Sequence, residues 1–378
     1  MSRTPSSDKP HLQSFHGRHE EFTERAYGNE GVLPDRYVFV LTNLCNLSCS
    51  FCFQVRDRRD DAMTKEDWLR LVEQLPEYSR VTLTGGEPLA FRGFDEVFQA
   101  ISERFDCNMI SNGLLLSEKK IDYLLSRPRF KVLSISIDDI GNKNRDVRPE
   151  KWEHLVRMMR SFVERRDALG SECLLDVKTV VLDKNAHELF AIYKHCVEEL
   201  RCDTHSFQLL KGSGLQHADY MVEFDELLKK SRAPVYAHYE TIQSELERVR
   251  RYNVEQGRVS FLHPKAASLD DTEELPDLCF LNAVEHDARR FSPCKFPWSS
   301  VHINVDGHLF PCLAVSMGNV KTTPLAQIIH GERFRHFRDV IRREGSIEAC
   351  NRCGWLRPLA TADLESTRGA TLVTARSG

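Results

Sequence analysis

The sequence predicts an α/β fold, a partial (β/α)6 TIM-like barrel followed by a small domain made of a β-hairpin and a helix. Short apolar runs alternate with helical patterns through the first part of the chain. Repeating strand–helix units imply parallel strands joined by right-handed crossovers. Towards the C-terminus, two alternating segments flank Asp306 and Gly307, a turn signal typical of a hairpin. Six strands are predicted before that hairpin, fewer than the eight of a closed TIM barrel.

The strands and helices can be placed along the chain in order. Strands are predicted at 38–41, 81–84, 108–111, 132–137, 174–182 and 206–210. Helices are predicted between them at 64–75, 94–105, 118–125, 152–166 and 187–200. The first helix has a capping signal, because Asp67 follows the candidate N-cap Thr64 by three residues. This alternation places the loops after successive strands at one end of the barrel, where the chemistry of parallel barrels gathers.

Composition and pattern divide the chain into five segments. We expect a partly disordered N-terminal extension (1–34), the barrel (35–222), a helical linker (223–290), the hairpin domain (291–358) and a flexible tail (359–378). No apolar signal or membrane-spanning segment is visible in the sequence, so we expect a cytoplasmic protein that does not bind a membrane. No basic stripe is present either, which argues against nucleic-acid binding.

Twelve cysteines, seven of them in groups, indicate metal binding. A cytoplasmic chain keeps its thiols reduced, so clustered cysteines there suggest ligands or catalytic groups before disulfides. Cys45, Cys49 and Cys52 stand close together in the sequence. Three thiolates cannot form a two-by-two zinc clip, but they can hold three corners of a cubane iron–sulfur cluster and leave the fourth iron open. A partial zinc knuckle and three incidental thiols are the alternatives.

This spacing, with Phe51 directly before the last cysteine, resembles the signature of the radical S-adenosylmethionine (SAM) superfamily. The resemblance implies that Cys45, Cys49 and Cys52 bind a [4Fe–4S] cluster whose fourth iron is chelated by SAM, with Phe51 packed near the adenine. A second motif agrees with it. Gly85, Gly86 and Glu87 follow the second predicted strand and precede a proline, which matches the family's Gly-Gly-Glu-Pro motif that contacts the SAM amino group.

Further cofactor contacts are expected at the ends of later strands. Asn112 follows the third strand, and Ser136 and Asp138 form a polar face at the end of the fourth. In the family, polar residues at the end of the fourth strand hydrogen-bond the ribose hydroxyls; an ordinary polar strand end is the alternative. Lys178 interrupts an apolar run and needs a carboxylate partner, either from SAM or from Asp176. The family's glycine-rich adenine motif on the fifth strand is not legible here.

The last third of the chain holds a second group, Cys294, Cys312, Cys350 and Cys353. The predicted hairpin brings the first two together, and the last two form a two-residue clip. Two pairs of cysteines suit structural zinc or an iron–sulfur site. The tail resembles the SPASM and shorter twitch extensions of radical SAM enzymes, which have a glycine ahead of the second cysteine, as Gly307 is here. No cysteine follows Cys353, so the resemblance implies the twitch type with one auxiliary [4Fe–4S] cluster.

Five cysteines remain outside these groups. Cys279 lies in the linker just before the auxiliary domain, and is our candidate donor of a hydrogen atom to a substrate radical; a plain packed cysteine is the alternative. The other four are expected to be small buried hydrophobic residues: Cys107, Cys173, Cys196 and Cys202.

The resemblance implies a radical SAM enzyme that cleaves SAM reductively to a 5′-deoxyadenosyl radical and takes a hydrogen atom from a substrate C–H bond. The chain resembles twitch-type dehydrogenases and epimerases of aminocyclitols and aminoglycosides. We therefore expect oxidation or epimerisation of a small, polar, carbohydrate-like natural product. The alternative is a SPASM-type maturase that crosslinks, oxidises or epimerises a ribosomal peptide. The stretch ahead of Tyr37 is short for a leader-binding module, although such a module can be a separate chain.

The expected partners follow from this chemistry. The first step needs an external one-electron reductant of the flavodoxin or ferredoxin type, and we expect a monomer or a weak dimer. The net charge of −4 is too small to select a substrate. Substrate class is thus inferred from the family and not from any residue of the site.

Overall fold

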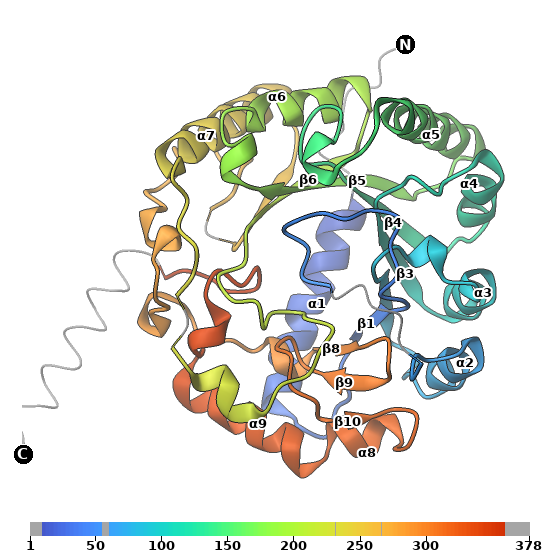
Figure 1. The fold of residues 1–378 in the computed structure, drawn as a ribbon, viewed down its shortest axis with the longest axis vertical. Helices are drawn as coiled ribbons and strands as arrows, with labels where there is room; N and C mark the ends of the chain where they lie inside the picture. Colours follow the sequence, from blue (N-terminus) through green and yellow to red (C-terminus); the bar gives the residue numbers. More distant parts are fainter. Residues whose placement is uncertain (1–9, 55–59, 231, 266, 360–378) are drawn as a thin grey trace, which may run out of the picture.

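The computed structural model describes residues 10–54, 60–230, 232–265 and 267–359. These residues contain one ten-stranded sheet with the order β10-β9-β8-β1-β2-β3-β4-β5-β6-β7. The strands are β1 Arg36–Val40, β2 Arg80–Thr84, β3 Asp106–Ser111, β4 Phe130–Ser136, β5 Leu174–Val181, β6 Thr204–Leu209, β7 Ser260–His263, β8 Ser300–Ile303, β9 His308–Phe310 and β10 Gly318–Asn319. Figure 1 shows the sheet curved inside a ring of helices, which is the predicted partial barrel.

Two strands extend the parallel part of the sheet beyond the six predicted. β7 pairs in parallel with β6, and it comes from the segment predicted to be a helical linker. β8 is the first strand of the predicted hairpin, and it pairs in parallel with β1 while β9 pairs with it in antiparallel fashion. The prediction missed both pairings because each joins residues far apart in the sequence, and local patterns carry no information on such partners. The barrel and the hairpin therefore share one sheet.

The helices match the predicted positions closely where they cross between barrel strands. α2 begins after Thr64, whose side chain accepts from the Asp67 amide while the Asp67 side chain accepts from the Thr64 amide, so the predicted capping box is confirmed. α6 continues into a π-helical turn at His195–Glu199, so the two together cover the predicted helix 187–200. The helices are α1 Pro10–Gly28, α2 Lys65–Glu73, α3 Phe94–Arg104, α4 Glu118–Leu125, α5 Pro149–Leu169, α6 Leu189–Lys194, α7 Tyr239–Gln256, α8 Leu325–Ile329 and α9 Glu332–Glu344.

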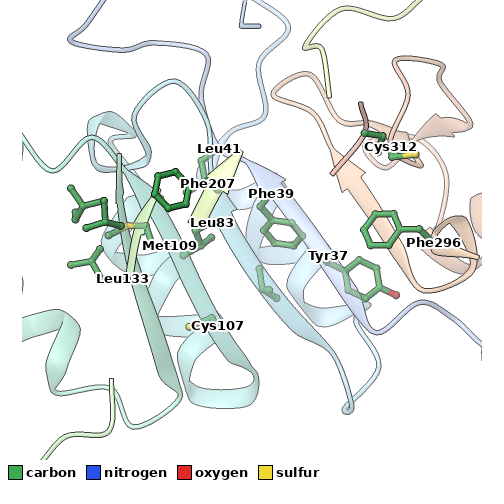
Figure 2. Packing of buried hydrophobic residues seen from close by; sticks show 14 of the residues in the cluster. Tyr37, Phe39, Leu41, Leu83, Cys107, Met109, Leu133, Phe207, Phe296 and Cys312 are labelled. Carbon is green, nitrogen blue, oxygen red and sulfur yellow. The ribbon is translucent and has the colours of Figure 1, made fainter. Parts of the chain in front are cut away.

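The main core lies between the convex face of the sheet and the ring of helices. Phe39, Leu83 and Met109 on β1, β2 and β3 are fully buried there, and Figure 2 shows them following one another across the strands. The ring centroid of Phe39 lies 4.9 Å from that of Trp68 on α2. Alternate residues of the same strands point to the concave face. There the side chains are largely polar, which leaves the inside of the barrel with hydrogen-bonding groups.

The N-terminal extension, predicted to be partly disordered, contains a long helix. Residues 10–28 form α1, which Figure 1 shows lying across the middle of the ring. His19 Nδ1 lies 2.9 Å from Asp35 Oδ1 before β1, and Thr23 donates to Ser299 Oγ before β8 at 2.8 Å. α1 thus covers the amino ends of the central strands. The sequence hides this because the helix is mostly polar, and among its residues of described burial (18–28) the buried apolar ones are Phe22 and Ala26. Residues 1–9 and the predicted tail beyond residue 359 lie outside the described residues.

The C-terminal segment lies against the other edge of the barrel. Gly354 packs on β6 and β7, because a side chain there would meet Gln208 Oε1 at 3.0 Å and His263 Cβ at 3.4 Å. The end of the chain that the structure describes therefore lies beside the last barrel strands. No helix among the described residues is both long enough and apolar enough to cross a membrane.

Candidate functional site

The loop that carries Cys45, Cys49 and Cys52 follows β1 and rests on the end of β2. A Cβ on Gly85 would lie 2.4 Å from Thr42 O, and one on Gly86 would lie 2.3 Å from Leu44 O. Gly85 also has a φ of 151°, which only glycine adopts readily. The Gly86 and Glu87 amides donate to Thr42 O at 2.6 Å and Leu44 O at 2.9 Å. The two glycines therefore let the cysteine loop pack directly on this backbone.

Glu87 ties the ends of β2 and β3 together. Its side chain is fully buried, and its carboxylate accepts from Ser111 Oγ at 2.9 Å and from the Asn112 amide at 2.8 Å. Burial raises the pKa of this carboxyl group to about 7, against the pull of those hydrogen bonds. Asn112 in turn donates from Nδ2 to Asn46 Oδ1 at 2.8 Å, and the same nitrogen lies 3.7 Å from Cys45 Sγ. Glu87 and Asn112 thus hold the first cysteine in place.

Arg145, which sequence reasoning missed, connects three predicted site residues. Its Nε lies 2.6 Å from Oδ2 of the fully buried Asp138. Its Nη1 lies 3.9 Å from Cys49 Sγ, and its guanidinium carbon lies 5.3 Å from the centroid of the Phe51 ring. Asp138 also accepts from the Val180 amide at 2.7 Å. Burial raises the pKa of Asp138, and the charge of Arg145 opposes that rise. A buried aspartate at a strand end, which requires a cation, was the available signal.

Ser136 and Lys178 face each other in register on β4 and β5. The Lys178 ammonium lies 3.1 Å from Asp176 Oδ2, so the second of the two partners predicted for it is confirmed. Asp176 also accepts from Ser134 Oγ at 2.8 Å and from Thr204 Oγ1 at 2.9 Å. These side chains form a polar network inside the barrel. Within the part of the chain that the structure describes, the Ser136 hydroxyl makes no hydrogen bond, and a ribose contact by Ser136 or Asp138 stays a prediction.

The second group of cysteines is brought together by the hairpin and the clip. Cys312, Cys350 and Cys353 are buried, and Cys294 is half-buried. Burial raises the pKa of all four thiols, and the Cys353 thiolate adds to the rise at Cys294, Cys312 and Cys350. For Cys294 the pKa reaches about 12. A cation bound among these four thiols would favour their thiolate forms, so metal binding would displace their protons together.

A pair of histidines supports the strand end that carries Cys312. His302 Nδ1 lies 2.5 Å from Pro311 O, and since a carbonyl can only accept, this nitrogen is the donor. Burial lowers the pKa of His302 to about 3, so its other nitrogen accepts from His217 Nδ1 at 2.9 Å. The pair links β8 to the loop that follows β6. Neither histidine was singled out from the sequence, because they stand 85 residues apart.

Both groups of cysteines lie in segments that match the models of known families. Residues 39–172 match the model of the Radical SAM superfamily, and residues 294–354 match that of the SPASM iron–sulfur cluster-binding domain. This chain contains a radical SAM domain and a SPASM domain. The first match contains Cys45, Cys49 and Cys52, and the second spans Cys294 to Cys353.

Its similar sequences include proteins of different function. The sporulation killing factor maturation protein SkfB of Bacillus subtilis is 33% identical over 175 residues, 44% of this chain and 40% of SkfB. An S-adenosylmethionine-dependent nucleotide dehydratase of Selenomonas ruminantium is 24% identical over 50% of this chain and 73% of its own length. The chain thus matches less than half the length of SkfB.

Solved radical SAM structures share the fold. SuiB of Streptococcus suis bound to its precursor peptide SuiA superimposes with a TM-score of 0.58 over 88% of this chain and 72% of SuiB, at 16% identity. AdoMet-bound anSMEcpe with a peptide gives a TM-score of 0.54 over 85% of this chain and 86% of its own, also at 16% identity. Identities this low establish the fold alone.

The two domains imply a SAM-binding [4Fe–4S] cluster and auxiliary iron–sulfur chemistry, and the residues fit both. No three His, Cys, Asp or Glu side chains within the described ranges are gathered closely enough to share one metal ion. In a four-iron cluster each cysteine binds a different iron, which requires a wider spacing than a single ion does. Four thiols, three of them buried and one half-buried, with the charge of Cys353 acting on the other three, form the donor set of such a cluster.

The remaining cysteines divide as predicted, apart from Cys279. Cys279 is exposed at the start of a 3-10 turn, and its amide donates to Asp277 Oδ1 at 2.8 Å. In the described part of the chain, no recorded contact joins it to the cysteine loop, so its role as a hydrogen-atom donor stays a prediction. The four others are all buried, as expected: Cys107, Cys173, Cys196 and Cys202.

Proposed function

We propose that this radical SAM enzyme modifies a peptide, through abstraction of a hydrogen atom from a C–H bond of one of its residues. The sequence similarity to a maturation protein supports this reading over a carbohydrate-like substrate. The TM-scores to SuiB and anSMEcpe, both solved with peptides, agree with a barrel of suitable shape.

The observation that carries the proposal is a set of exposed apolar side chains on loops at the carboxyl ends of the barrel strands, here called the rim. The rim consists of exposed apolar side chains on the loops that follow β1, β3, β4 and β6: Leu44 at 46%, Phe53 at 41%, Leu115 at 41%, Ile140 at 44% and Tyr220 at 42% exposure. A small polyhydroxylated substrate would be held by polar groups and would gain little from such a rim. Side chains of a peptide that lies across the mouth would bury it.

The residues of the chain position the reaction. When bound, the first cluster supplies the electron that cleaves SAM into methionine and the 5′-deoxyadenosyl radical. Glu87 and Asn112 hold the loop of that cluster, and Arg145 joins the same loop to Asp138. Helix α1 covers the amino ends of the barrel strands and excludes water from that end. The substrate therefore enters at the carboxyl ends, where the cysteine loop lies.

A small polar substrate, as expected for an aminocyclitol enzyme, is the competing function. The observation in its favour is the polar network inside the barrel, where Asp176 accepts from Ser134 and Thr204 and pairs with Lys178. A carbohydrate could replace some of these hydrogen bonds. The network also suits the polar backbone of one peptide residue, and the exposed rim is the observation that favours a peptide.

The test compares the two substrate classes directly. The reconstituted protein is incubated without oxygen with SAM, dithionite and either the short peptides encoded beside its gene or an aminocyclitol. We expect 5′-deoxyadenosine formation to rise with peptide, and the peptide to lose two hydrogen atoms or to take up deuterium from heavy water. Turnover of the aminocyclitol with no change in any peptide would overturn the proposal.

Variants of the rim sharpen this test. Leu115→Asp should raise KM for the peptide about thirtyfold, since burial of a leucine side chain contributes about 2 kcal/mol. Leu169→Asp is the matched control, because this leucine is 62% exposed at the end of α5, at the opposite end of the barrel. Equal KM values for the two variants would show that the peptide does not contact the rim.

A further inference from the structure

Lys211, on the loop that follows β6, lies between the two cluster-binding segments. Its ammonium nitrogen lies 4.1 Å from the centroid of the Phe53 ring, and Phe53 directly follows Cys52. The same nitrogen donates to Gln216 O at 3.2 Å. The side chain therefore contacts the loop of the first cluster from a position fixed on its own loop.

That loop is fastened to the auxiliary site. The Gln216 side chain donates from Nε2 to Ala349 O at 2.9 Å and to Asn351 O at 2.6 Å, on either side of Cys350. The Gly212 amide donates to the same Asn351 oxygen at 3.0 Å, and a Cβ on Gly212 would meet Asn351 at 2.7 Å. Gln216 also forms a bridge with Leu313, which follows Cys312. The position of Lys211 is thus set by the backbone that holds the auxiliary cysteines.

The charges that act on Lys211 are those of the cysteines. Burial lowers its pKa to about 8, and thiolates at Cys353, Cys52 and Cys312 oppose this. Two of those three residues belong to the auxiliary site and one to the SAM site. Among the described residues, no carboxylate forms a recorded ion pair with Lys211. Its positive charge is therefore directed at the clusters and is not neutralised by an acidic side chain.

We propose that Lys211 is a positioning residue for electron transfer, whose charge raises the reduction potential of the auxiliary cluster. A cluster gains a negative charge when it is reduced, and a fixed cation nearby stabilises that form. The loop that carries Lys211 is hydrogen-bonded to the backbone on both sides of Cys350, which keeps the ammonium beside the auxiliary site. A raised potential favours the auxiliary cluster as the acceptor of an electron. This inference rests on both clusters being present and is independent of the substrate class.

The test measures reduction potentials in full-length protein. Cys45, Cys49 and Cys52 are replaced by Ala, so that only the auxiliary cluster remains. Its reduction potential is measured by a redox titration that is monitored by electron paramagnetic resonance. Lys211→Met should lower the ratio of reduced to oxidised cluster at a fixed potential about tenfold, which corresponds to about 59 mV for one electron. Lys211→Arg should keep the wild-type potential, because it keeps the charge.

Two controls separate this role from a structural one. Lys131→Met also removes one positive charge, but at the amino end of β4, where the lysine donates to Pro128 O at 2.9 Å. This variant should leave the reduction potential of the auxiliary cluster unchanged. Lys211→Gln is a second neutral variant, in case the methionine variant loads too little iron. An auxiliary potential equal to wild type in a neutral Lys211 variant, or equal shifts in the Lys211 and Lys131 variants, would overturn the inference. Neither result depends on which substrate is turned over.

Discussion

At the scale of single residues, Arg145 shows what a buried charge does at this site. The sequence places Cys49, Phe51 and Asp138 in two separate segments, and the guanidinium of Arg145 contacts all three. Sequence reasoning found the three contacts but not the residue that joins them. An arginine after a strand is common, and only the fold shows that its partner is fully buried.

We predict that Arg145→Met destabilises the protein and weakens SAM binding. The change leaves the buried Asp138 carboxylate without its cation, which costs about 3 kcal/mol in the free energy of unfolding. Loosening of the cysteine loop should weaken SAM binding about tenfold, the loss of about one charge-assisted hydrogen bond. Anaerobic urea denaturation and calorimetric titration with SAM measure the two effects.

The double variant Asp138→Asn with Arg145→Met is the matched control. It removes both charges, while the asparagine oxygen can still accept from the Val180 amide. The double variant should regain most of the unfolding free energy that Arg145→Met loses. Its affinity for SAM should stay as low as that of Arg145→Met. If the single variant is as stable as wild type, the ion pair does not hold this loop.

The pH dependence of stability should include His205. Burial lowers the pKa of this imidazole to about 3, well below the usual value of 6.5. The unfolded chain takes up a proton near pH 6.5 and the folded chain does not, so stability is lost as pH falls below 6.5. Between pH 7 and pH 5.5 this group should cost about 1 kcal/mol.

The variant His205→Phe tests that contribution. Phenylalanine fits the aromatic surroundings, where Phe207 lies at 4.4 Å and Tyr193 at 5.3 Å between ring centroids. Between pH 7 and pH 5.5, the unfolding free energy of this variant should decrease by about 1 kcal/mol less than that of the wild-type protein. The exposed His187→Gln should follow wild type. A slope unchanged in His205→Phe contradicts the assignment.

At the scale of elements, the barrel strands and helices were predictable because each has a local signal. Strands β1 to β6 and helices α2 to α6 alternate in the pattern that parallel sheets require, and the Thr64 capping box was read correctly. Helix α1 and strand β7 were not found. Helix α1 is mostly polar and strand β7 has only four residues, and both are stabilised by contacts with distant segments.

The glycines after β2 give a prediction about one element. Gly86→Ala would place a methyl group 2.3 Å from Leu44 O, where the backbone must move. The cysteine loop should shift, and we expect loss of at least half of the iron bound at the first site, about two irons per chain. Iron content in the Cys350→Ala, Cys353→Ala background measures the first site alone.

Gly214→Ala is the control for that experiment. Nothing lies within 4 Å of its Cβ position, so iron content and stability should match wild type. Full iron content in Gly86→Ala would show that the loop adapts to the methyl group. The glycines would then be needed only for close approach of SAM, as the sequence motif first suggested.

At the scale of the whole molecule, the auxiliary domain is part of the barrel and not an appendage. Strand β8 pairs with β1 at one edge, and Gly354 packs on β6 and β7 at the other. The Cys350–Cys353 clip also anchors the loop that carries Lys211. Loss of the auxiliary cluster should therefore affect both electron transfer and stability.

Replacement of Cys350 and Cys353 by Ala tests this. Iron should fall from about eight to about four per chain, since one four-iron cluster is lost. Formation of 5′-deoxyadenosine should continue with dithionite, whereas modified product should disappear. Four irons and one zinc in the wild-type protein would contradict an auxiliary cluster.

The variant Cys279→Ala is a control for iron content, because its thiol is exposed. It should keep all iron and the cleavage of SAM. If Cys279 donates a hydrogen atom, the same variant loses product. Unchanged product would remove that role.

The sequence by itself determined the two domain types and the cofactor class that they imply. Two motifs carry this information: the cysteine spacing from Cys45 to Cys52 and the run Gly85–Gly86–Glu87. Each is contiguous in the sequence, so it can be recognised without knowledge of the fold. The tertiary structure decided how the parts are joined: β8 against β1, Arg145 against Asp138, and Lys211 between the two cysteine sites. Most of these contacts join segments that are distant in the chain. They form because burial and charge in the folded protein favour them, which local sequence patterns do not reveal.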